Sequence, residues 1–272
     1  MWRLRRLLTD LKRSKGSFLV DVNGSKYLDL NCNISSLPVG YNHPKIVDKM
    51  SQASHLLNQR SALNLWCPQE QARHMETTFS KMCPHDALSP IPWLGNSGSE
   101  GVESALKHCI QYVCKDKNLE NSNNEFKVIS FQGGFHGRTL GALSCTQSNS
   151  LHKENFPQIP QITAPFPESN SLEDAQRCVK ELKDLMFTSK QEKEEIFATI
   201  VEPVQCEGGD RHAHHSFFQG VRSLCLEFSI PFVVDEVQTG MATGKMYAHQ
   251  HWNLDECPDV VVFGKKYQVA GC

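Results

Sequence analysis

The sequence lacks several features that would assign it to common classes of protein. No apolar run approaches the length needed to cross a bilayer. Neither sign of charge dominates, because the sequence has 28 Lys and Arg and 30 Asp and Glu. We therefore expect no general affinity for nucleic acid or for an anionic membrane. At 272 residues the chain is long enough for one large domain or two modest ones.

The cysteines lack the spacing of a metal or redox motif. There are 11 of them, an odd number, and no Cys-x-x-Cys occurs. This argues against zinc ribbons and thioredoxin-like chemistry, and it predicts reduced thiols in an intracellular compartment. His212, His214 and His215 have no carboxylate or cysteine partners at ligand spacing, so we predict a loop before a helix and no metal site.

Two nucleotide-binding motifs are also missing. No Gly-x-Gly-x-x-Gly follows the first predicted strand, which argues against a nicotinamide dehydrogenase. The stretch from Gly240 to Lys245 is one residue shorter than a phosphate loop and lacks the Ser or Thr that follows the Lys.

The N-terminal segment interleaves basic residues with leucines over residues 1–15. This pattern predicts an amphipathic basic helix, either a mitochondrial transit segment or an ordinary surface helix. Residues 18–30 carry Asn23-Gly24 between two apolar runs, which predicts a β-hairpin whose turn residues both need positive φ. We therefore expect a helix and hairpin segment over residues 1–30 and one large domain over residues 31–272.

Predicted strands and helices alternate along the large domain. Helices are expected over 46–57, 69–82, 97–113, 172–186 and 217–228, and buried strands over 127–131, 197–201, 230–235 and 260–263. The charged run 190–195 is interpreted as a solvated end. Such alternation predicts an α/β fold with a mostly parallel, doubly wound sheet.

Polar residues follow the predicted strands. Asp235 ends the most apolar strand, where an isolated Asp would otherwise be read as a loop or capping residue. Ser97 and Glu100 match a capping box, and Gly98-Ser99 at the helix start is either an anion site or part of a plain cap. In an open α/β sheet, ligands bind beyond the carboxyl ends of the strands.

The glycine-rich loop after the strand 127–131 presents Phe135, His136 and Arg138. Arg138 suits bidentate capture of a carboxylate or phosphate. His136 is either a general base or, more simply, a hydrogen-bond partner of the backbone in a tight turn. Together with a Lys after the last strand, these groups are nearly the set that pyridoxal phosphate requires.

Several motifs in register resemble those of class III (ω-amino acid) aminotransferases of fold type I, most closely the eukaryotic 4-aminobutyrate branch. The segments that carry the resemblance are Asn96–Glu100, Phe135–Thr139, Leu151–Lys153, Ile200–Asp210, Val234–Gly240 and Tyr247–Trp252. The likeness runs from about Phe18 to the end of the chain.

The resemblance implies a site for pyridoxal 5'-phosphate. Asp235 would pair with the pyridinium nitrogen, Gln238 would contact the phenolic oxygen, and Phe135 and Val237 would cover the two ring faces. Gly98 and Ser99 would hold the phosphate. Lys265, rather than Lys266, would form the Schiff base, because the family's Lys lies six residues after the Asp that is here Asp259.

The resemblance also implies the substrates. Arg138 would bind the substrate carboxylate, Ile34 would line the pocket, and Glu207 would switch the site between an ω-amino acid and 2-oxoglutarate. The implied reaction converts 4-aminobutyrate and 2-oxoglutarate into succinate semialdehyde and glutamate. Alternatives are a lysine, ornithine or β-alanine type of donor, or an inactive truncated isoform.

The resemblance further implies a homodimer in the mitochondrial matrix, with a cytoplasmic location as the alternative. The chain departs from the family pattern in two respects. Its sequence stops shortly after Lys265, so we expect it to lack the last sheet strand and the C-terminal domain. Ser97 and Glu100 occupy positions where animal 4-aminobutyrate transaminases carry a Cys pair, so we expect no iron–sulfur cluster.

Overall fold

The computed structural model describes residues 8–52, 73, 77–78, 91–118 and 125–272. The chain divides into two compact units, Met1–Glu76 and Thr77–Cys272. The domain boundary predicted after residue 30 stays a prediction. Within the described ranges, no helix combines the length and the apolar character that a membrane span would need.

The predicted β-hairpin is present in the first unit. Strands β1 (Phe18–Val20) and β2 (Lys26–Leu28) pair antiparallel, with Phe18 opposite Leu28. The turn differs from the predicted one, because only Gly24 has a positive φ (91°). The carboxylate of Asp21 closes the turn instead, accepting hydrogen bonds from the backbone N–H groups of Asn23 (2.9 Å) and Ser25 (2.8 Å). An Asx-type closure leaves Asn23 free of the strained conformation.

The rest of the first unit corrects the helix predicted at the N-terminus. Residues 1–7 lie outside the described residues, and 8–15 form turns and bridges, Thr9 with Asp21 and Lys15 with Phe18, because their backbone pairs with the hairpin. Helix α1 (Cys32–Ser35) is one left-handed turn with φ from 50° to 61°, followed by α2 (Pro44–Gln52). Residues beyond 52 in the helix predicted over 46–57, and nearly all of 69–82, lie outside the described residues.

The second unit is built on a five-stranded parallel sheet, in the order β10-β9-β6-β4-β5. Its strands are β4 (Phe126–Phe131), β5 (Gln161–Ala164), β6 (Glu195–Val201), β9 (Phe232–Asp235) and β10 (Val260–Val262). The predicted α/β fold with a parallel sheet is therefore confirmed.

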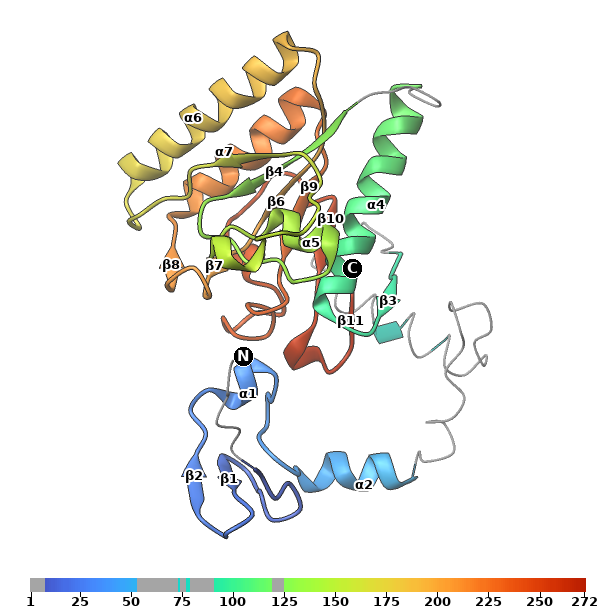
Figure 1. Cartoon of the computed structure of the whole chain (residues 1–272), viewed down its shortest axis with the longest axis vertical. Helices are drawn as coiled ribbons and strands as arrows, with labels where there is room; N and C mark the ends of the chain where they lie inside the picture. Colours follow the sequence, from blue (N-terminus) through green and yellow to red (C-terminus); the bar gives the residue numbers. More distant parts are fainter. Residues whose placement is uncertain (1–7, 53–72, 74–76, 79–90, 119–124) are drawn as a thin grey trace. The chain divides into compact units, whose positions relative to one another are not determined.

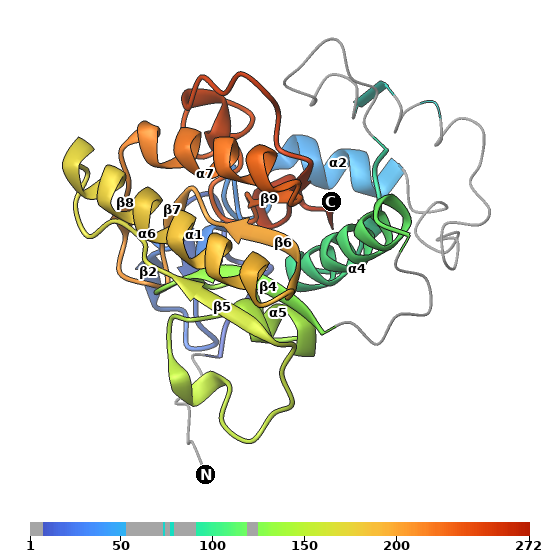
Figure 2. The same ribbon diagram turned by 90° about the horizontal axis from the view of Figure 1, so that it is seen from above.

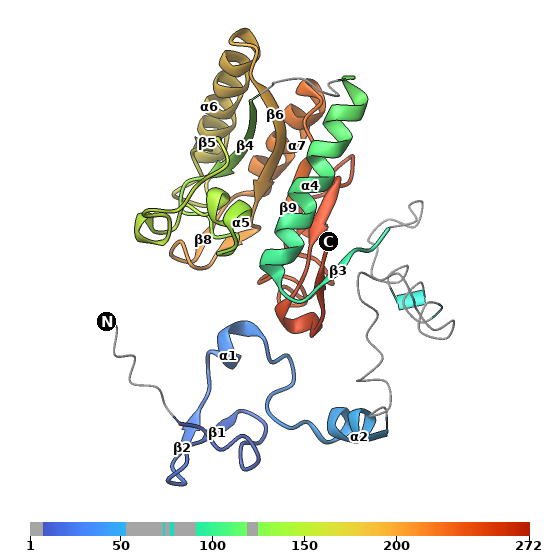
Figure 3. The same ribbon diagram turned by 45° about the vertical axis from the view of Figure 1, so that its right-hand side comes forward.

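Helices cover both faces of this sheet. The long helices are α4 (Gly98–Asp116), α6 (Leu172–Gln191) and α7 (His215–Phe228), with the short α5 (Leu140–Cys145). Helices α6 and α7 pack on one face and α4 and α5 on the other (Figures 1 and 3). The perpendicular view in Figure 2 shows α6 and α7 together on one side of the strands.

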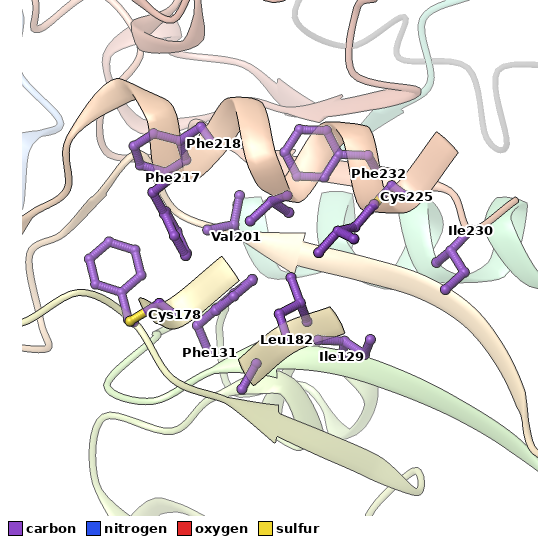
Figure 4. Close-up of a cluster of buried hydrophobic side chains, with 14 of the residues drawn as sticks. Ile129, Phe131, Cys178, Leu182, Val201, Phe217, Phe218, Cys225, Ile230 and Phe232 are labelled. Atoms are coloured by element: carbon purple, nitrogen blue, oxygen red, sulfur yellow. The ribbon is translucent and has the colours of Figure 1, made fainter. Parts of the chain in front are cut away.

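Both faces of the central strands are buried, which explains their nearly continuous apolar sequence. In β9, Phe232 and Val234 belong to the core under α6 and α7, whereas Val233 belongs to the core under α4. Figure 4 shows the first of these cores, in which aromatic rings from α7 meet side chains of the strands. Phe131 and Phe217 contact edge to face, with ring centroids 5.4 Å apart.

Short elements complete the second unit. Strand β3 (Leu94–Gly95) pairs antiparallel with β11 (Ala270–Gly271), and Phe263 bridges to Gly271. Strands β3 and β11 form a two-stranded sheet apart from the five-stranded one, so the expectation that the chain lacks its last sheet strand stays a prediction. The described residues of this unit also form the hairpin of β7 (Val204–Gln205) and β8 (Arg211–His212) and 3-10 turns at Ser150–His152, Ala248–His251 and Lys265–Tyr267.

The charged run 190–195 is not merely a solvated end. Helix α6 ends at Gln191, and two of the three glutamates that follow form ion pairs, Glu194 with Lys127 and Glu195 with Lys117. Strand β6 begins at Glu195 and pairs with β4, so the strand pairing brings these carboxylates to lysines that are distant in sequence.

The stability of the second unit depends on the core under α6 and α7. Leu182 is fully buried there, so Leu182→Ala is expected to lower the free energy of unfolding by about 3 kcal/mol, through lost burial and the cavity left behind. Urea unfolding followed by circular dichroism measures this loss. Leu226→Ala is the matched control, because Leu226 is 50% exposed, and an equal loss in both variants would contradict the assignment of this core.

Candidate active site

The candidate site lies where the strands of the parallel sheet end. Strands β4 and β6 are neighbours in the sheet. The chain continues from β4 to β5, which lies on the side of β4 away from β6, and from β6 to β9, which lies on the side of β6 away from β4. The carboxyl ends of β4 and β6 therefore flank a topological switch point, the usual place for a ligand in an open α/β sheet. Asp235 ends β9, and Lys265 follows β10, which pairs with β9 through Val262 opposite Asp235.

Asp235 is a buried carboxylate with two partners, and it is only 5% exposed. Its Oδ1 accepts a hydrogen bond from the backbone N–H of Val237 (3.0 Å), and its Oδ2 lies 2.9 Å from Nδ1 of His136. The prediction that His136 bonds to backbone in its turn misses this contact. The imidazole reaches from the loop after β4 across the sheet edge, because the parallel strands bring both residues to the same end.

The start of α4 forms the predicted cap. Ser97 is the N-cap, and its side chain accepts from the backbone N–H of Glu100 (3.2 Å). The Glu100 carboxylate accepts a hydrogen bond from the backbone N–H of Asn96 (2.6 Å). In a capping box the donor would be the backbone N–H of the N-cap residue, Ser97. The N–H groups of the first helical turn, those of Gly98 and Ser99 among them, have no partner inside the helix and favour an anion.

Glycines allow this helix start to approach the loops around it. A Cβ on Gly98 would lie 2.6 Å from Cγ2 of Val237, in the loop after β9. A Cβ on Gly137, which has a φ of 123°, would lie 2.2 Å from Oγ of Ser99. The structure therefore brings Gly98, Ser99 and Val237 together with the glycine-rich loop, as expected for one binding site.

Lys265 follows β10, and its side chain reaches the loop after β9. It adopts an uncommon left-handed conformation (φ 49°), and its Nζ donates a hydrogen bond to the side-chain oxygen of Gln238. Burial lowers the pKa of Lys265, although Asp235 and nearby acids oppose this. Lys266 differs, because its Nζ donates to the backbone carbonyl of Gln238.

Phe135 and Arg138 lie side by side in the loop after β4. The guanidinium carbon of Arg138 is 5.8 Å from the centre of the Phe135 ring, and its Nη2 is 3.4 Å from Nε2 of His152. The Phe135 and His152 rings meet edge to face, with centroids 6.2 Å apart. Arg138 is exposed, so its guanidinium is open to a carboxylate from solvent.

Two glutamates follow β6. Glu207 is exposed and close enough to Lys265 to influence its pKa. Glu202 is buried (6% exposed), and its Oε2 accepts from the backbone N–H of Phe135 (2.7 Å). The sequence prediction did not select Glu202, although it directly follows a buried strand, the same signal that selected Asp235.

Ile34, His214 and a groove in the second unit lie outside this set of residues. Ile34 is 63% exposed in the first unit, so its place in the pocket stays a prediction. His214 caps α7, accepting from the backbone N–H of Ser216 (3.3 Å). A groove of about 580 Å³ lies at the amino ends of β9 and β10, bordered by Ile230 and Asp259, and so is not part of the candidate site.

Comparisons with known proteins identify the family. The family profile "Aminotransferase class-III" matches residues 3–271. A mitochondrial 4-aminobutyrate aminotransferase of Mus musculus is 36% identical over 96% of this chain and 57% of its own length. The 4-aminobutyrate aminotransferase of Dictyostelium discoideum is 35% identical over 99% of this chain and 59% of its own length.

A solved structure shows the same fold. The lysine aminotransferase of M. tuberculosis in its internal aldimine form superposes with a TM-score of 0.86 at 30% identity, covering 100% of this chain and 64% of that protein. This chain thus spans a little more than half the length of the curated relatives that it matches. It belongs to the class III aminotransferases, a family of pyridoxal-phosphate-dependent enzymes.

Proposed function

We propose that this protein transfers the amino group of 4-aminobutyrate to 2-oxoglutarate, giving succinate semialdehyde and glutamate. The proposal rests on three groups that lie together at one end of the sheet. They are the buried carboxylate of Asp235, the half-buried amine of Lys265 and the helix N-terminus at Gly98. The relatives named 4-aminobutyrate aminotransferase support this choice of donor.

The residues at the edge fit pyridoxal 5'-phosphate. The N–H groups of Gly98 and Ser99 provide donors for a phosphate, and a side chain on Gly98 would fill the space beside Val237. Asp235 would keep a proton on the pyridine nitrogen, and Gln238 would contact the phenolic oxygen. Phe135 and Val237 are proposed to cover the two ring faces.

Pyridoxal phosphate supplies an aldehyde that takes up an amine and a ring that accepts the electron pair left when a neighbouring C–H loses its proton. The protein must then provide a base of suitable pKa. Lys265 meets this need, because burial lowers its pKa and enlarges the neutral fraction of Nζ near neutral pH. Its Nζ would take the proton from one carbon and return it to the other.

Arg138 is proposed to bind the substrate carboxylate. A guanidinium makes two parallel hydrogen bonds with a carboxylate, and the exposed position of Arg138 beside Phe135 leaves its donors accessible. Glu207 is proposed to alternate this site between the ω-amino acid and 2-oxoglutarate, and Ile34 to line the pocket.

A second candidate donor class follows from one comparison. The M. tuberculosis lysine aminotransferase covers the whole of this chain with a TM-score of 0.86, which favours lysine as the alternative donor. Ornithine and β-alanine are alternatives that follow from the sequence resemblance alone. Homodimer formation and a location in the mitochondrial matrix are also proposals. The mammalian relatives are named as mitochondrial, and residues 1–15 are basic and rich in leucine.

Formation of glutamate from 2-oxoglutarate distinguishes the donors. With pyridoxal phosphate present, kcat/KM for 4-aminobutyrate is expected to exceed that for lysine and for ornithine by about tenfold or more, the range that a difference in chain length and charge provides. A preference for lysine would replace the proposed donor with the alternative. Absence of glutamate with every donor, despite bound cofactor, would contradict the proposed activity of this chain.

The variant Arg138→Lys sharpens this test. Loss of a bidentate contact is expected to raise KM for 4-aminobutyrate about tenfold, while the visible absorbance of the bound cofactor stays unchanged. Arg177→Lys is the matched control, because Arg177 lies on α6 and pairs with Asp174 and Glu181. An unchanged KM in Arg138→Lys would remove Arg138 from the substrate site.

A further inference from the structure

Glu202 connects the two strands on either side of the switch point. It follows β6, yet its carboxylate binds the backbone N–H of Phe135, in the loop after β4, at 2.7 Å. A Cβ on the neighbouring Gly134 would lie 3.7 Å from the same oxygen. The hydrogen bond therefore fixes the main chain of the residue proposed to stack on the cofactor ring.

The surroundings of Glu202 disfavour a negative charge on it. The side chain is buried, and Asp235 approaches from β9, so burial first and Asp235 second raise the pKa of Glu202 well above its usual range. Glu207 adds to this effect, while the hydrogen bond from Phe135 and the charge of Lys265 oppose it.

We propose that Glu202 is a positioning residue that acts as a neutral carboxylic acid. It fixes the loop after β4, which carries Phe135, without placing a second negative charge beside Asp235. This role rests on the proposed function, because it concerns the ring-stacking residue of the cofactor site. Of two carboxylates that share a buried site, only one ionises readily. Keeping Glu202 neutral leaves the charge on Asp235, where it can hold a proton on the pyridine nitrogen.

Glutamine is the discriminating substitution. In Glu202→Gln the amide oxygen still accepts from Phe135 and the side chain is neutral at every pH, so it imitates the proposed state of Glu202. Glu202→Ala removes the acceptor altogether. Exposed Glu181 on α6 provides a matched control, Glu181→Gln.

The first measurement is the affinity for pyridoxal phosphate, followed by visible absorbance. Glu202→Gln is expected to bind within about twofold of the wild type, whereas Glu202→Ala is expected to bind about tenfold more weakly, because it leaves a backbone donor unpaired beside the ring. If Glu202→Gln weakens binding as much as Glu202→Ala, the carboxylate acts as an ion and the proposal is wrong. Failure of the wild type to bind the cofactor would instead contradict the proposed function.

The second measurement needs no cofactor and tests the charge directly. A carboxyl group whose folded pKa lies above its unfolded pKa stabilises the fold most below the unfolded value, and this contribution is lost as pH rises through the folded value. The urea midpoint of Glu202→Gln should therefore increase relative to that of the wild type between about pH 5 and about pH 8. A difference that does not change with pH, or that falls, would overturn the neutral state of Glu202, and Glu181→Gln should show no such trend.

Discussion

Replacing Lys265 with alanine is expected to abolish covalent attachment of pyridoxal phosphate to the chain and to slow amino transfer about 10³-fold. The side chain follows β10 and reaches Gln238 near the buried Asp235, and its lowered pKa makes the amine nucleophilic at a pH where most lysines are protonated. Borohydride fixes the cofactor to the amine that holds it, and peptide mapping then identifies the labelled residue.

Lys266→Ala is the matched control for this experiment. Lys266 is adjacent in sequence but donates to the backbone carbonyl of Gln238, so its loss is expected to leave labelling in place. Labelling of Lys265 should also begin at a lower pH than the ordinary pKa of a lysine would allow, because burial lowers its pKa. A label on Lys266 in the wild-type chain would refute the assignment of Lys265.

Asp235→Ala is expected to lower the free energy of unfolding by about 3 kcal/mol and to weaken cofactor binding about 100-fold. The first effect arises because the substitution leaves the buried imidazole of His136 without its partner. The second arises because no carboxylate remains to hold a proton on the pyridine nitrogen. Urea unfolding measures the first effect, and visible absorbance during cofactor titration measures the second.

Asp235→Asn separates the two effects. The amide keeps the size of the side chain and can still hydrogen-bond to His136, so stability should fall less than in Asp235→Ala, while cofactor affinity should fall almost as far. Asp255→Ala, at an exposed position, should change neither quantity. Unchanged cofactor affinity in both Asp235 variants would show that this carboxylate does not face the ring.

Local sequence signals predicted the long helices α4, α6 and α7 and four of the five strands of the parallel sheet, and they missed β5. Ser97 with Glu100 predicted the start of α4, and the run ending at Asp235 predicted a strand buried on both faces. These signals act over a few residues, through caps and side-chain periodicity, so they can be read without knowledge of the fold. The predicted N-terminal helix failed over residues 8–15 because the backbone there pairs with the hairpin instead.

The sequence by itself thus determined the alternation of strands and helices, and it placed Asp235 and Lys265 just after strands. Only the tertiary structure decided which side chains meet, as in the contacts of His136 with Asp235 and of Glu202 with Phe135. Both contacts depend on the strand order β10-β9-β6-β4-β5. That order results from packing helices on both faces of one parallel sheet, and residues far apart in the chain become neighbours only when the strands pair.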